Sequence, residues 1–345
     1  MKQSILFIIN PISGTTRKTD IPRLIENNID ADRFSVTTVE TSYAGHASAL
    51  ASRAKDSRTD IVVAVGGDGT VNEVARSIVG SDTALGIIPC GSGNGLARHL
   101  MLPLDLRRAI RLINRCEIHT LDYGLINDNP FFCTCGMGFD AFISMKFAEA
   151  GRRGLATYVE KVLAEGLRYK PQTYSIEFPD ATDDIPPFKA VLVSCANASQ
   201  YGNNAYIAPQ ASMRDGLLDV IIMEPFDLIE APQVIMEMMN KTLDTCPKIR
   251  TFKTNEIIVH RQKADYIHYD GDPLMTGADV HIRLINQGIR VIVNPNADKT
   301  RRRPNAIQTT FSNIFNDISD LRAEILRQTP GIQDINKFID RLIGN

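Results

Sequence analysis

The chain has 345 residues, and its hydrophobic content of 43% and charged content of 23% are ordinary for a globular protein with room for two domains. A formal net charge of −2 gives no electrostatic basis for binding nucleic acid, so we expect no nucleic-acid partner. No stretch approaches the roughly 18 consecutive apolar residues of a membrane span, and the first apolar run is too short for a signal peptide.

Six cysteines are scattered along the chain, mostly in apolar surroundings. Cys133 and Cys135 are separated by a single residue, and no matching His or Cys pair follows them, so their spacing does not suit a zinc site. We interpret the cysteines as buried free thiols of a reducing compartment. Together with the lack of an apolar span, this interpretation predicts a cytoplasmic location.

Predicted strands and helices alternate over the first 120 residues. Apolar runs indicate strands at residues 5–9, 34–40, 61–65 and 84–88. Helical patterns are found at residues 20–28, 72–78 and 106–113, and another runs to residue 54 after a cap at 41–43. This alternation predicts a parallel sheet with helices on its faces, and we assign residues 1–120 to one α/β domain. Ligands of such sheets bind at the carboxyl ends of the strands.

Polar turns follow these strands, and the turn after the third one reads Gly66-Gly67-Asp68-Gly69-Thr70. Its glycines allow an anion to approach the backbone N–H groups closely. The Asp68 carboxylate would repel a phosphate unless a divalent cation lies between them or the carboxylate takes a proton. The alternative is an ordinary strand-to-helix turn that Asp68 caps.

From about residue 121 the chain changes to short alternating runs separated by turns, the last of them at 280–284 and 289–293. We predict a mostly antiparallel β domain over residues 121–298, built from two packed sheets. A helical insert is expected at residues 141–169. Its apolar side chains either belong to the core or line a lipid cavity.

Residues 299–345 form a distinct tail, in which apolar residues recur at intervals of three and four. This spacing predicts a helical hairpin with one apolar face. Docking on the protein's own body and homodimerisation are the two main uses of such a face. Contact with a membrane surface, helped by the arginines at 301–303, is a third.

Three turns together resemble a known family. They read Asn10-Pro11-Ile12-Ser13-Gly14, Gly66 to Glu73, and Pro89 to Leu96. The set resembles the catalytic domain of the diacylglycerol kinase and sphingosine kinase family, especially the soluble bacterial lipid kinases, over roughly residues 4–295. The central motif is shared with NAD kinases and phosphofructokinases, whereas the flanking motifs favour lipid kinases. The resemblance implies an NAD kinase-like and phosphofructokinase-like α/β domain, a lipid-binding β-sandwich, and ATP and Mg²⁺ as cofactors.

Two further segments match motifs of this family in the second domain. The segment from Ser212 to Leu217 resembles its metal loop, in which a hard cation takes the Asp215 carboxylate and the main-chain carbonyls of Ser212 and Leu217. Tyr269-Asp270-Gly271-Asp272-Pro273 resembles its catalytic Asp-Gly-Glu segment. The second acidic residue here is Asp272 in place of glutamate, so Asp270 and Asp272 are both candidates for the general base.

The spacing of these two carboxylates allows two structures. On a continuing strand they would point the same way, and one could raise the pKa of the other, which suits a general base. The alternative is a solvated β-turn, for which Asp-Gly-Asp-Pro is also suitable. His46 and His268 lie near the motifs and are expected to pack or cap.

Phosphoryl transfer from ATP needs backbone N–H groups around the phosphates, Mg²⁺ to neutralise charge, and a carboxylate to accept the hydroxyl proton. No lysine follows the glycines, so this is not a Walker loop, and we expect Asp68 to hold Mg²⁺ through water. The predicted catalytic residues are Asp68, Asp270 and Asp272. The predicted nucleotide-binding residues are Asn10, Pro11, Ser13, Gly14, Thr41, Gly66, Gly67, Asp68, Gly69, Thr70, Asn72, Glu73, Ser92 and Asn94.

The sequence thus predicts an ATP-dependent kinase of a diacylglycerol-, sphingoid- or related lipid. Because the lipid would come from a membrane, we expect a cytoplasmic protein with transient peripheral contact at the inner membrane face. Two alternatives are a kinase of a soluble acceptor, such as NAD or a sugar phosphate, and a catalytically silent nucleotide- or lipid-binding regulator. The intact Asp68, Asp215 and Asp270 argue against the regulator.

Overall fold

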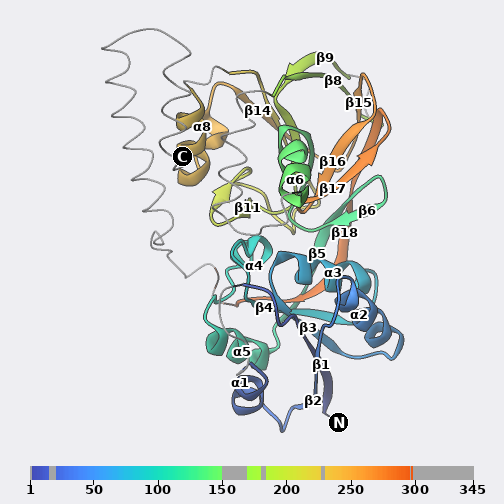
Figure 1. Cartoon of the computed structure of the whole chain (residues 1–345), viewed down its shortest axis with the longest axis vertical. Coiled ribbons are helices and arrows are strands. Elements are labelled where there is room, and N and C mark those ends of the chain that lie inside the picture. The colour runs from blue at the N-terminus through green and yellow to red at the C-terminus, as the bar shows by residue number, and fades with distance from the viewer. Residues whose placement is uncertain are drawn as a thin grey trace.

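The computed structural model describes residues 2–14, 21–149, 169–179, 184–226, 230–295 and 297. The first part of the chain forms a parallel sheet in the order β2-β1-β3-β4, which confirms the predicted α/β unit, at the bottom of Figure 1. Its strands are β1 (Gln3–Ile9), β2 (Phe34–Glu40), β3 (Ile61–Gly66) and β4 (Ala84–Pro89). Its helices are α1 (Ile21–Asn28), α2 (His46–Asp56), α3 (Asp68–Ile78), α4 (Gly95–His99) and α5 (Leu106–Arg115).

Helices cover both faces of this sheet (Figure 1). Side chains of β3 alternate between the faces, because successive residues of a strand point to opposite sides. Val62 and Ala64 belong to the apolar core that contains residues of α2 and α3, and Val63 belongs to the core that contains residues of α1. All of β3 and β4 is buried, as is typical of parallel strands with continuous apolar sequences.

The second part of the chain is the predicted β-sandwich, at the top of Figure 1. One sheet has the antiparallel order β14-β13-β10-β7-β16-β17. The other contains β18, β15, β8 and β9, with β5 and β6 attached, and the two sheets share one apolar core. The first sheet consists of β7 (Thr134–Gly138), β10 (Leu192–Ala196), β13 (Leu218–Met223), β14 (Ile249–Thr254), β16 (Asp265–Tyr269) and β17 (Asp272–Thr276).

The remaining elements complete the second sheet and its surroundings. The strands of that sheet are β5 (Ile118–Ile126), β6 (Asn129–Phe131), β8 (Gln172–Glu177), β9 (Ile185–Ala190), β15 (Glu256–Arg261) and β18 (Asp279–Ile292). A small ribbon of β11 (Gln200–Gly202) and β12 (Ala205–Tyr206) lies apart from both sheets. The helices are α6 (Phe139–Glu149), α8 (Ala231–Asn240) and the 3-10 turn η2 (Leu243–Thr245).

Strand β18 joins the two units. It pairs with β15 and β5 in the sandwich, and Val291 near its end pairs in parallel with Leu85 of β4. The sequence predicted two strands here, but the structure has one, because a shift in register between Ile285 and Ile289 interrupts the alternation without ending the strand. The predicted boundary at residue 120 lies inside β5, which follows β18 across both units.

Two predicted elements lie wholly or partly outside the described residues. Helix α6 covers the start of the expected insert, and residues 150–168 are not described. The expected hairpin at 299–345 is also outside them. Among the residues that are described, no helix is both long and apolar enough to cross a bilayer. All six cysteines are free thiols, and four of them are buried.

Candidate active site

The three glycine-rich turns lie against one another at the carboxyl ends of β1, β3 and β4. A Cβ at Gly14 would fall 1.8 Å from the carbonyl oxygen of Cys90, and one at Gly91 would fall 2.6 Å from the Cα of Gly67. The backbones approach this closely only because glycine has no Cβ. Three turns that the sequence predicted as parts of one nucleotide site are therefore adjacent in space.

Asp68 begins α3 and ties the second turn to the third. Its Oδ2 accepts the N–H of Asn94 at 2.8 Å, and its Oδ1 accepts the N–H of Gly95 at 2.7 Å. These N–H groups belong to the start of α4, where helical N–H groups have no partner within their own helix. Burial raises the pKa of the Asp68 carboxyl, whereas the N–H bonds and the charge of Arg98 lower it. Asp68 thus caps α4, a helix other than its own.

The Asp68 site fits a magnesium ion that enters with phosphates. The carboxylate oxygens have lone pairs beyond these N–H bonds and can accept hydrogens from water around a cation. Mg²⁺ usually keeps several waters and is held by one or two carboxylates plus substrate phosphates. Over the described residues, no group of three or more His, Cys, Asp or Glu side chains is arranged to hold a metal ion. The donors therefore do not form a preformed metal cage.

Asn10 connects the first turn to the second. Its Nδ2 donates to Thr70 Oγ1 at 3.0 Å, and its Oδ1 accepts the N–H of Ile12 at 3.1 Å. Ser13 Oγ donates to the carbonyl oxygen of Asn10 at 3.2 Å. Pro11 is exposed at the tip of this turn. Asn10, Ser13 and Thr70 therefore shape the turns, whatever they contribute to a ligand.

Glu73 holds the loop that follows β2. Its two carboxylate oxygens accept the N–H groups of Gly45 at 3.3 Å and Ser48 at 3.4 Å, around the start of α2. Thr41 begins this loop, and its N–H donates to the carbonyl of Ile9 at 2.8 Å, at the end of β1. Glu73 is thus a support for the loop that carries Thr41.

The other predicted nucleotide residues differ in exposure. Gly69 and Ser92 are exposed, whereas Asn72 is buried inside α3. The Asn94 side chain closes its own turn, because its Oδ1 accepts the N–H of Gly91 at 2.9 Å and its Nδ2 donates to the Gly91 carbonyl at 2.7 Å. Gly69 and Ser92 are therefore the members of this group that a ligand can reach without rearrangement.

On the sandwich side, Asp270 and Gly271 form the two-residue turn between β16 and β17, in which Tyr269 pairs with Asp272. Both turn residues have positive φ, +53° and +88°, as a type I′ hairpin turn requires, and Asp-Gly is a favoured pair there. The strand does not continue through the motif, so the same-face arrangement of the two carboxylates does not form. The Asp270 side chain is 3% exposed, and that of Asp272 is 52% exposed.

The buried Asp270 carboxylate accepts backbone N–H groups from residues 132–134, where β7 begins. Its Oδ1 accepts from Cys133 at 2.7 Å and Thr134 at 3.1 Å, and its Oδ2 accepts from Phe132 at 2.8 Å. Burial raises the pKa of the Asp270 carboxyl, whereas Arg76 and these N–H groups lower it. The main cause of the raised pKa is thus burial, and not the neighbouring carboxylate that the sequence suggested.

Arg76 reaches from α3 to the acidic turn. Its Nη1 donates to Asp272 Oδ2 at 2.6 Å, its Nη2 to the Tyr269 carbonyl at 3.1 Å, and its Nε to the Pro130 carbonyl at 3.0 Å. Its Nη2 also lies 4.0 Å from Asp270 Oδ2, and the guanidinium lies 4.4 Å from the centre of the Tyr269 ring. A single arginine of the α/β unit therefore contacts the sandwich at five places.

Sequence reasoning missed Arg76, which is separated from Asp272 by 196 residues. The only sequence feature that could have indicated it is a basic residue on the helix that begins at Asp68, and such a residue is usually exposed to solvent. The two buried carboxylates of the site also lie near one residue, because Asp270 and Asp68 both raise the pKa of the Cys133 thiol, after burial itself. Asp68 from one unit and Asp270 from the other thus belong to one neighbourhood.

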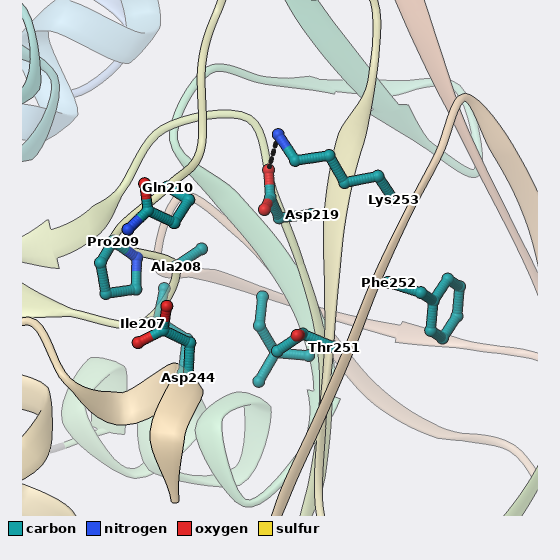
Figure 2. A pocket seen from close by; sticks show the side chains of 10 residues that line it. Ile207, Ala208, Pro209, Gln210, Asp219, Asp244, Thr251, Phe252 and Lys253 are labelled. Carbon is teal, nitrogen blue, oxygen red and sulfur yellow. Dashed lines mark ion pairs between the residues drawn. The ribbon is translucent and has the colours of Figure 1, made fainter.

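The predicted metal loop is bound by a lysine. The Lys253 ammonium lies 2.7 Å from Asp215 Oδ2 and 3.2 Å from Asp219 Oδ2, and Figure 2 shows the second of these ion pairs at the edge of a cavity of about 300 Å³. Burial lowers the pKa of Lys253, but the bonds to the two carboxylates outweigh burial and raise it. A divalent cation on the same Asp215 oxygen would be repelled by the ammonium. The Lys253 ammonium therefore occupies the Asp215 oxygen that a cation would use, and cation binding by Asp215 stays a prediction.

Asp122 links this loop to β18 and was also missed by sequence reasoning. Its side chain is fully buried; its Oδ2 accepts the N–H of Gly216 at 3.0 Å and its Oδ1 that of Gln287 at 2.7 Å. The main-chain carbonyls of Ser212 and Leu217 stay predicted cation ligands.

Comparison with known proteins gives two matches that together cover most of the chain. Residues 4–126 match the family described as the diacylglycerol kinase catalytic domain. Residues 133–293 match the YegS C-terminal NAD kinase beta sandwich-like domain. The junction between the two matches lies just after β5.

Relatives of known name carry the same assignment. The "Probable lipid kinase YegS-like" of Chromohalobacter salexigens is 33% identical over 55% of this chain and 63% of its own length, so the chain spans less than two thirds of it. The "Diacylglycerol kinase" of Mycobacterium tuberculosis is 30% identical over 62% of this chain and 71% of its own length.

Solved structures show the fold. A diacylglycerol kinase structure from Bacillus anthracis aligns with a TM-score of 0.65 at 20% identity, over 86% of this chain and 98% of that one. An NAD kinase from Archaeoglobus fulgidus in complex with ATP aligns with a TM-score of 0.51 at 12% identity, over 86% of this chain and 96% of that one. The NAD kinase-like fold that the sequence predicted is therefore confirmed.

Replacing Lys253 tests whether the loop at 212–217 uses an ammonium or a metal ion. In the wild type we expect the melting temperature to be the same with Mg²⁺ and with a chelator, because Lys253 already neutralises Asp215. Lys253→Met should lower the melting temperature and make it rise with Mg²⁺, measured by scanning calorimetry. Lys263→Met, at an exposed lysine, is the control. A wild-type melting temperature that falls on chelation would contradict this expectation and favour the predicted metal loop.

Arg76→Lys tests the contact between the two units. Lysine keeps the charge, but its single nitrogen cannot take the three separate places of Nε, Nη1 and Nη2, so we expect the free energy of unfolding to fall by about 1–2 kcal/mol. Urea unfolding followed by circular dichroism measures the change. Arg53→Lys on the exposed side of α2 is the matched control. Equal stability of the two variants would show that the contacts of Arg76 contribute nothing to the fold.

Proposed function

The chain belongs to the diacylglycerol kinase catalytic-domain family of lipid kinases, and from that membership we propose that it transfers the γ-phosphate of ATP to a hydroxyl group of a lipid. The contact that carries the proposal is made by Arg76. This residue binds the acidic turn of the sandwich from α3, the helix whose first residue is Asp68 in the glycine-rich turn. One helix therefore joins the phosphate side of the reaction to the carboxylate side.

The glycine-rich turns support binding of the nucleotide phosphates. Helix α3 has 11 residues and begins at Asp68, so its first N–H groups and its dipole favour an anion at that end. The likeness to an NAD kinase solved with ATP supports ATP as the donor. Mg²⁺, when bound with the phosphates, would neutralise their charge, and Asp68 would hold it through water.

Asp270 is the proposed general base. As the lipid hydroxyl oxygen bonds to the γ-phosphorus, its proton passes to the Asp270 carboxylate, the bond from the γ-phosphorus to the bridging oxygen breaks, and ADP leaves. Burial raises the pKa of Asp270, which makes it a better proton acceptor. Its Oδ2 accepts one N–H, from Phe132, and keeps a lone pair for the hydroxyl group.

Asp272 has a different proposed role. Its Oδ2 is bonded to Arg76 Nη1 at 2.6 Å, and this charge-assisted bond engages one carboxylate oxygen and directs it at the guanidinium. Asp272 is therefore proposed to hold the guanidinium near Asp270. This division of roles accounts for the tolerance of aspartate where the family has glutamate, because the second carboxylate does not need to reach the substrate.

Helix α6 favours a lipid over a soluble acceptor. It packs beside β16 and β17, the strands that carry the acidic turn. Its residues Phe142, Met145 and Phe147 are only half-buried, although they are apolar. Two further large apolar side chains are exposed: Ile12, 84% exposed, in the first glycine-rich turn, and Met275, 52% exposed, in β17. Apolar surface beside both turns suits a substrate whose chains are apolar and a transient contact with a membrane surface.

The proposed reaction is tested with radiolabelled ATP and a native lipid extract, followed by mass spectrometry of the phosphorylated products. A labelled glycerolipid or sphingoid lipid supports the proposal and names the acceptor class. Vesicle flotation is run in parallel. Label on a water-soluble acceptor, with no vesicle binding, would replace the lipid kinase with a kinase of a soluble acceptor. ATP binding without phosphate transfer to any acceptor would favour the alternative of a catalytically silent regulator.

Neutralising single carboxylates separates their roles. We expect Asp270→Asn to lower kcat by about 10²- to 10⁴-fold, because the base is lost. Asp68→Asn should raise the KM for ATP and lower kcat, and Asp272→Asn should have a smaller effect than either. Asp128→Asn, with a side chain that is 89% exposed, is the control. Full activity in both Asp68→Asn and Asp270→Asn would refute the mechanism, and a larger loss in Asp272→Asn would exchange the two roles.

The acidic limb of the pH profile reports on Asp270. Catalysis needs the ionised carboxylate, and burial raises its pKa, so kcat/KM should fall with decreasing pH at a midpoint above about 3.9, the ordinary value for aspartate. Arg76 lowers this pKa. Arg76→Gln should therefore move the midpoint upward, whereas Arg76→Lys, which keeps the charge, should move it less. A midpoint that moves downward in Arg76→Gln would contradict the assignment.

A further inference from the structure

We propose that a buried Asp140–His268 pair is the positioning unit of the Asp270–Gly271 turn, and that Tyr201 ties this pair to the glycine-rich turn at 93–95. The inference deepens the proposed function, on which it rests, by assigning residues that set the place of the general base. Asp140 is the second residue of α6, His268 lies in β16, and Tyr201 lies in β11.

His268 has two hydrogen-bond partners that fix its tautomer. Its side chain is 2% exposed, its Nδ1 accepts the N–H of Gly271 at 3.4 Å, and its Nε2 lies 3.0 Å from Asp140 Oδ2. Because Nδ1 accepts, the ring hydrogen is on Nε2 and is donated to the carboxylate. The imidazole therefore connects Asp140 to the backbone of the acidic turn, one residue from Asp270.

Asp140 is held from three sides. Its side chain is 6% exposed; Oδ1 accepts the N–H of Ala141 at 2.8 Å, and Oδ2 accepts the hydroxyl of Tyr201 at 3.2 Å in addition to His268. A Cβ at Gly136 would fall 2.6 Å from the same Oδ2, so only glycine leaves room for the carboxylate. A buried carboxylate with this many partners has one position, and so does the imidazole bonded to it.

Tyr201 connects the pair to the nucleotide side. A Cβ at Gly95 would fall 3.2 Å from the Tyr201 carbonyl oxygen, and one at Gly202 would fall 3.1 Å from the Cα of Gly93. The N–H of Asn203 donates to the Gly93 carbonyl at 3.1 Å. Strand β11 thus lies directly on the turn at 93–95, whose amides bind Asp68. A continuous set of contacts runs from Asp68 through Tyr201, Asp140 and His268 to Gly271.

Packing alone does not account for this arrangement. Burying a carboxylate and an imidazole costs more than burying apolar side chains of the same volume, unless their bonds are complete. The bonds are complete here, and they end on a backbone N–H of the turn that carries the proposed base. A displacement of about 1 Å at a reacting group can cost about 100-fold in rate. Holding the turn in place is therefore a sufficient function for the pair.

Two replacements of His268 separate positioning from packing. In His268→Asn, the amide oxygen takes the place of Nδ1 and can still accept the N–H of Gly271, but the donor to Asp140 is lost. In His268→Gln, the longer amide can still donate to Asp140, but the acceptor for Gly271 is lost. Both variants remove the ring, so both should lower the melting temperature by similar amounts.

We expect His268→Gln to lower kcat by about 10- to 100-fold with little change in the KM for ATP, and His268→Asn, which keeps the bond to Gly271 but loses the bond to Asp140, to lower kcat by a smaller factor. Hydrogen exchange of the peptide that spans residues 266–275 should quicken at Gly271 in the glutamine variant alone. The exchange measurement needs no acceptor lipid, so it tests the positioning bond even if the wild type phosphorylates no lipid. Equal kcat and equal exchange in the two variants, or wild-type values in His268→Gln, would overturn the proposal.

Discussion

A buried carboxylate must have hydrogen-bond donors, and in this protein that requirement determines where distant loops meet. Asp68 accepts two N–H groups from the start of α4, and Asp270 accepts three from residues 132–134, where β7 begins. Asp122 accepts one from the loop at 212–217 and one from β18. Leaving a buried polar group without hydrogen-bond partners costs about 1–3 kcal/mol, and the cost is higher when the group is charged. These three aspartates therefore hold distant loops together, and the turns around the site depend on them.

The difference between local patterns and these long-range hydrogen bonds explains what the sequence could and could not predict. The strands and helices of the α/β unit follow from local periodicity, so residues 61–65 and 84–88 were predicted within one residue of β3 and β4. Asp-Gly at 270–271 is a known hairpin pair, but its sequence does not say which way the first carboxylate points. Burial of Asp270 results from N–H groups more than 130 residues away, and no local pattern encodes that contact.

The sequence also did not show that one strand, β18, joins the two units, and the reason is related. The irregularity at 285–289 breaks the alternation of β18 while the strand goes on to pair with β4. Arg76 was overlooked because a basic residue on an amphipathic helix is usually solvated, whereas here two carbonyls and a carboxylate surround it. His268 was expected to pack or cap, and it is buried, but its two ring nitrogens also bond to Asp140 and to the backbone of the acidic turn.

Burial and Arg76 act in opposite directions on Asp270, and their balance depends on how the units are aligned. Burial raises its pKa, and the guanidinium lowers it from 4.0 Å away. If α3 moved away from the sandwich, Asp270 would no longer have the charge of Arg76 nearby, and its carboxyl would keep its proton to higher pH. A carboxylic acid cannot accept the proton of a substrate hydroxyl. Alignment of the two units would therefore control the ionisation of the base as well as its distance from the phosphates.

The loop at 212–217 affects that alignment through Asp122. One oxygen of Asp122 holds Gly216 of the loop and the other holds Gln287 of β18, the strand that continues into the α/β sheet. The group that neutralises Asp215 thus supports a loop that is connected to β18 by the two hydrogen bonds of Asp122. An ammonium fixed to β14 supplies this charge from within the chain, at a constant local concentration, whereas a free cation would supply it only when its own concentration suffices. If Lys253 neutralises Asp215 in place of a metal ion, the junction between the units does not depend on the metal supply on which the phosphoryl transfer itself would draw.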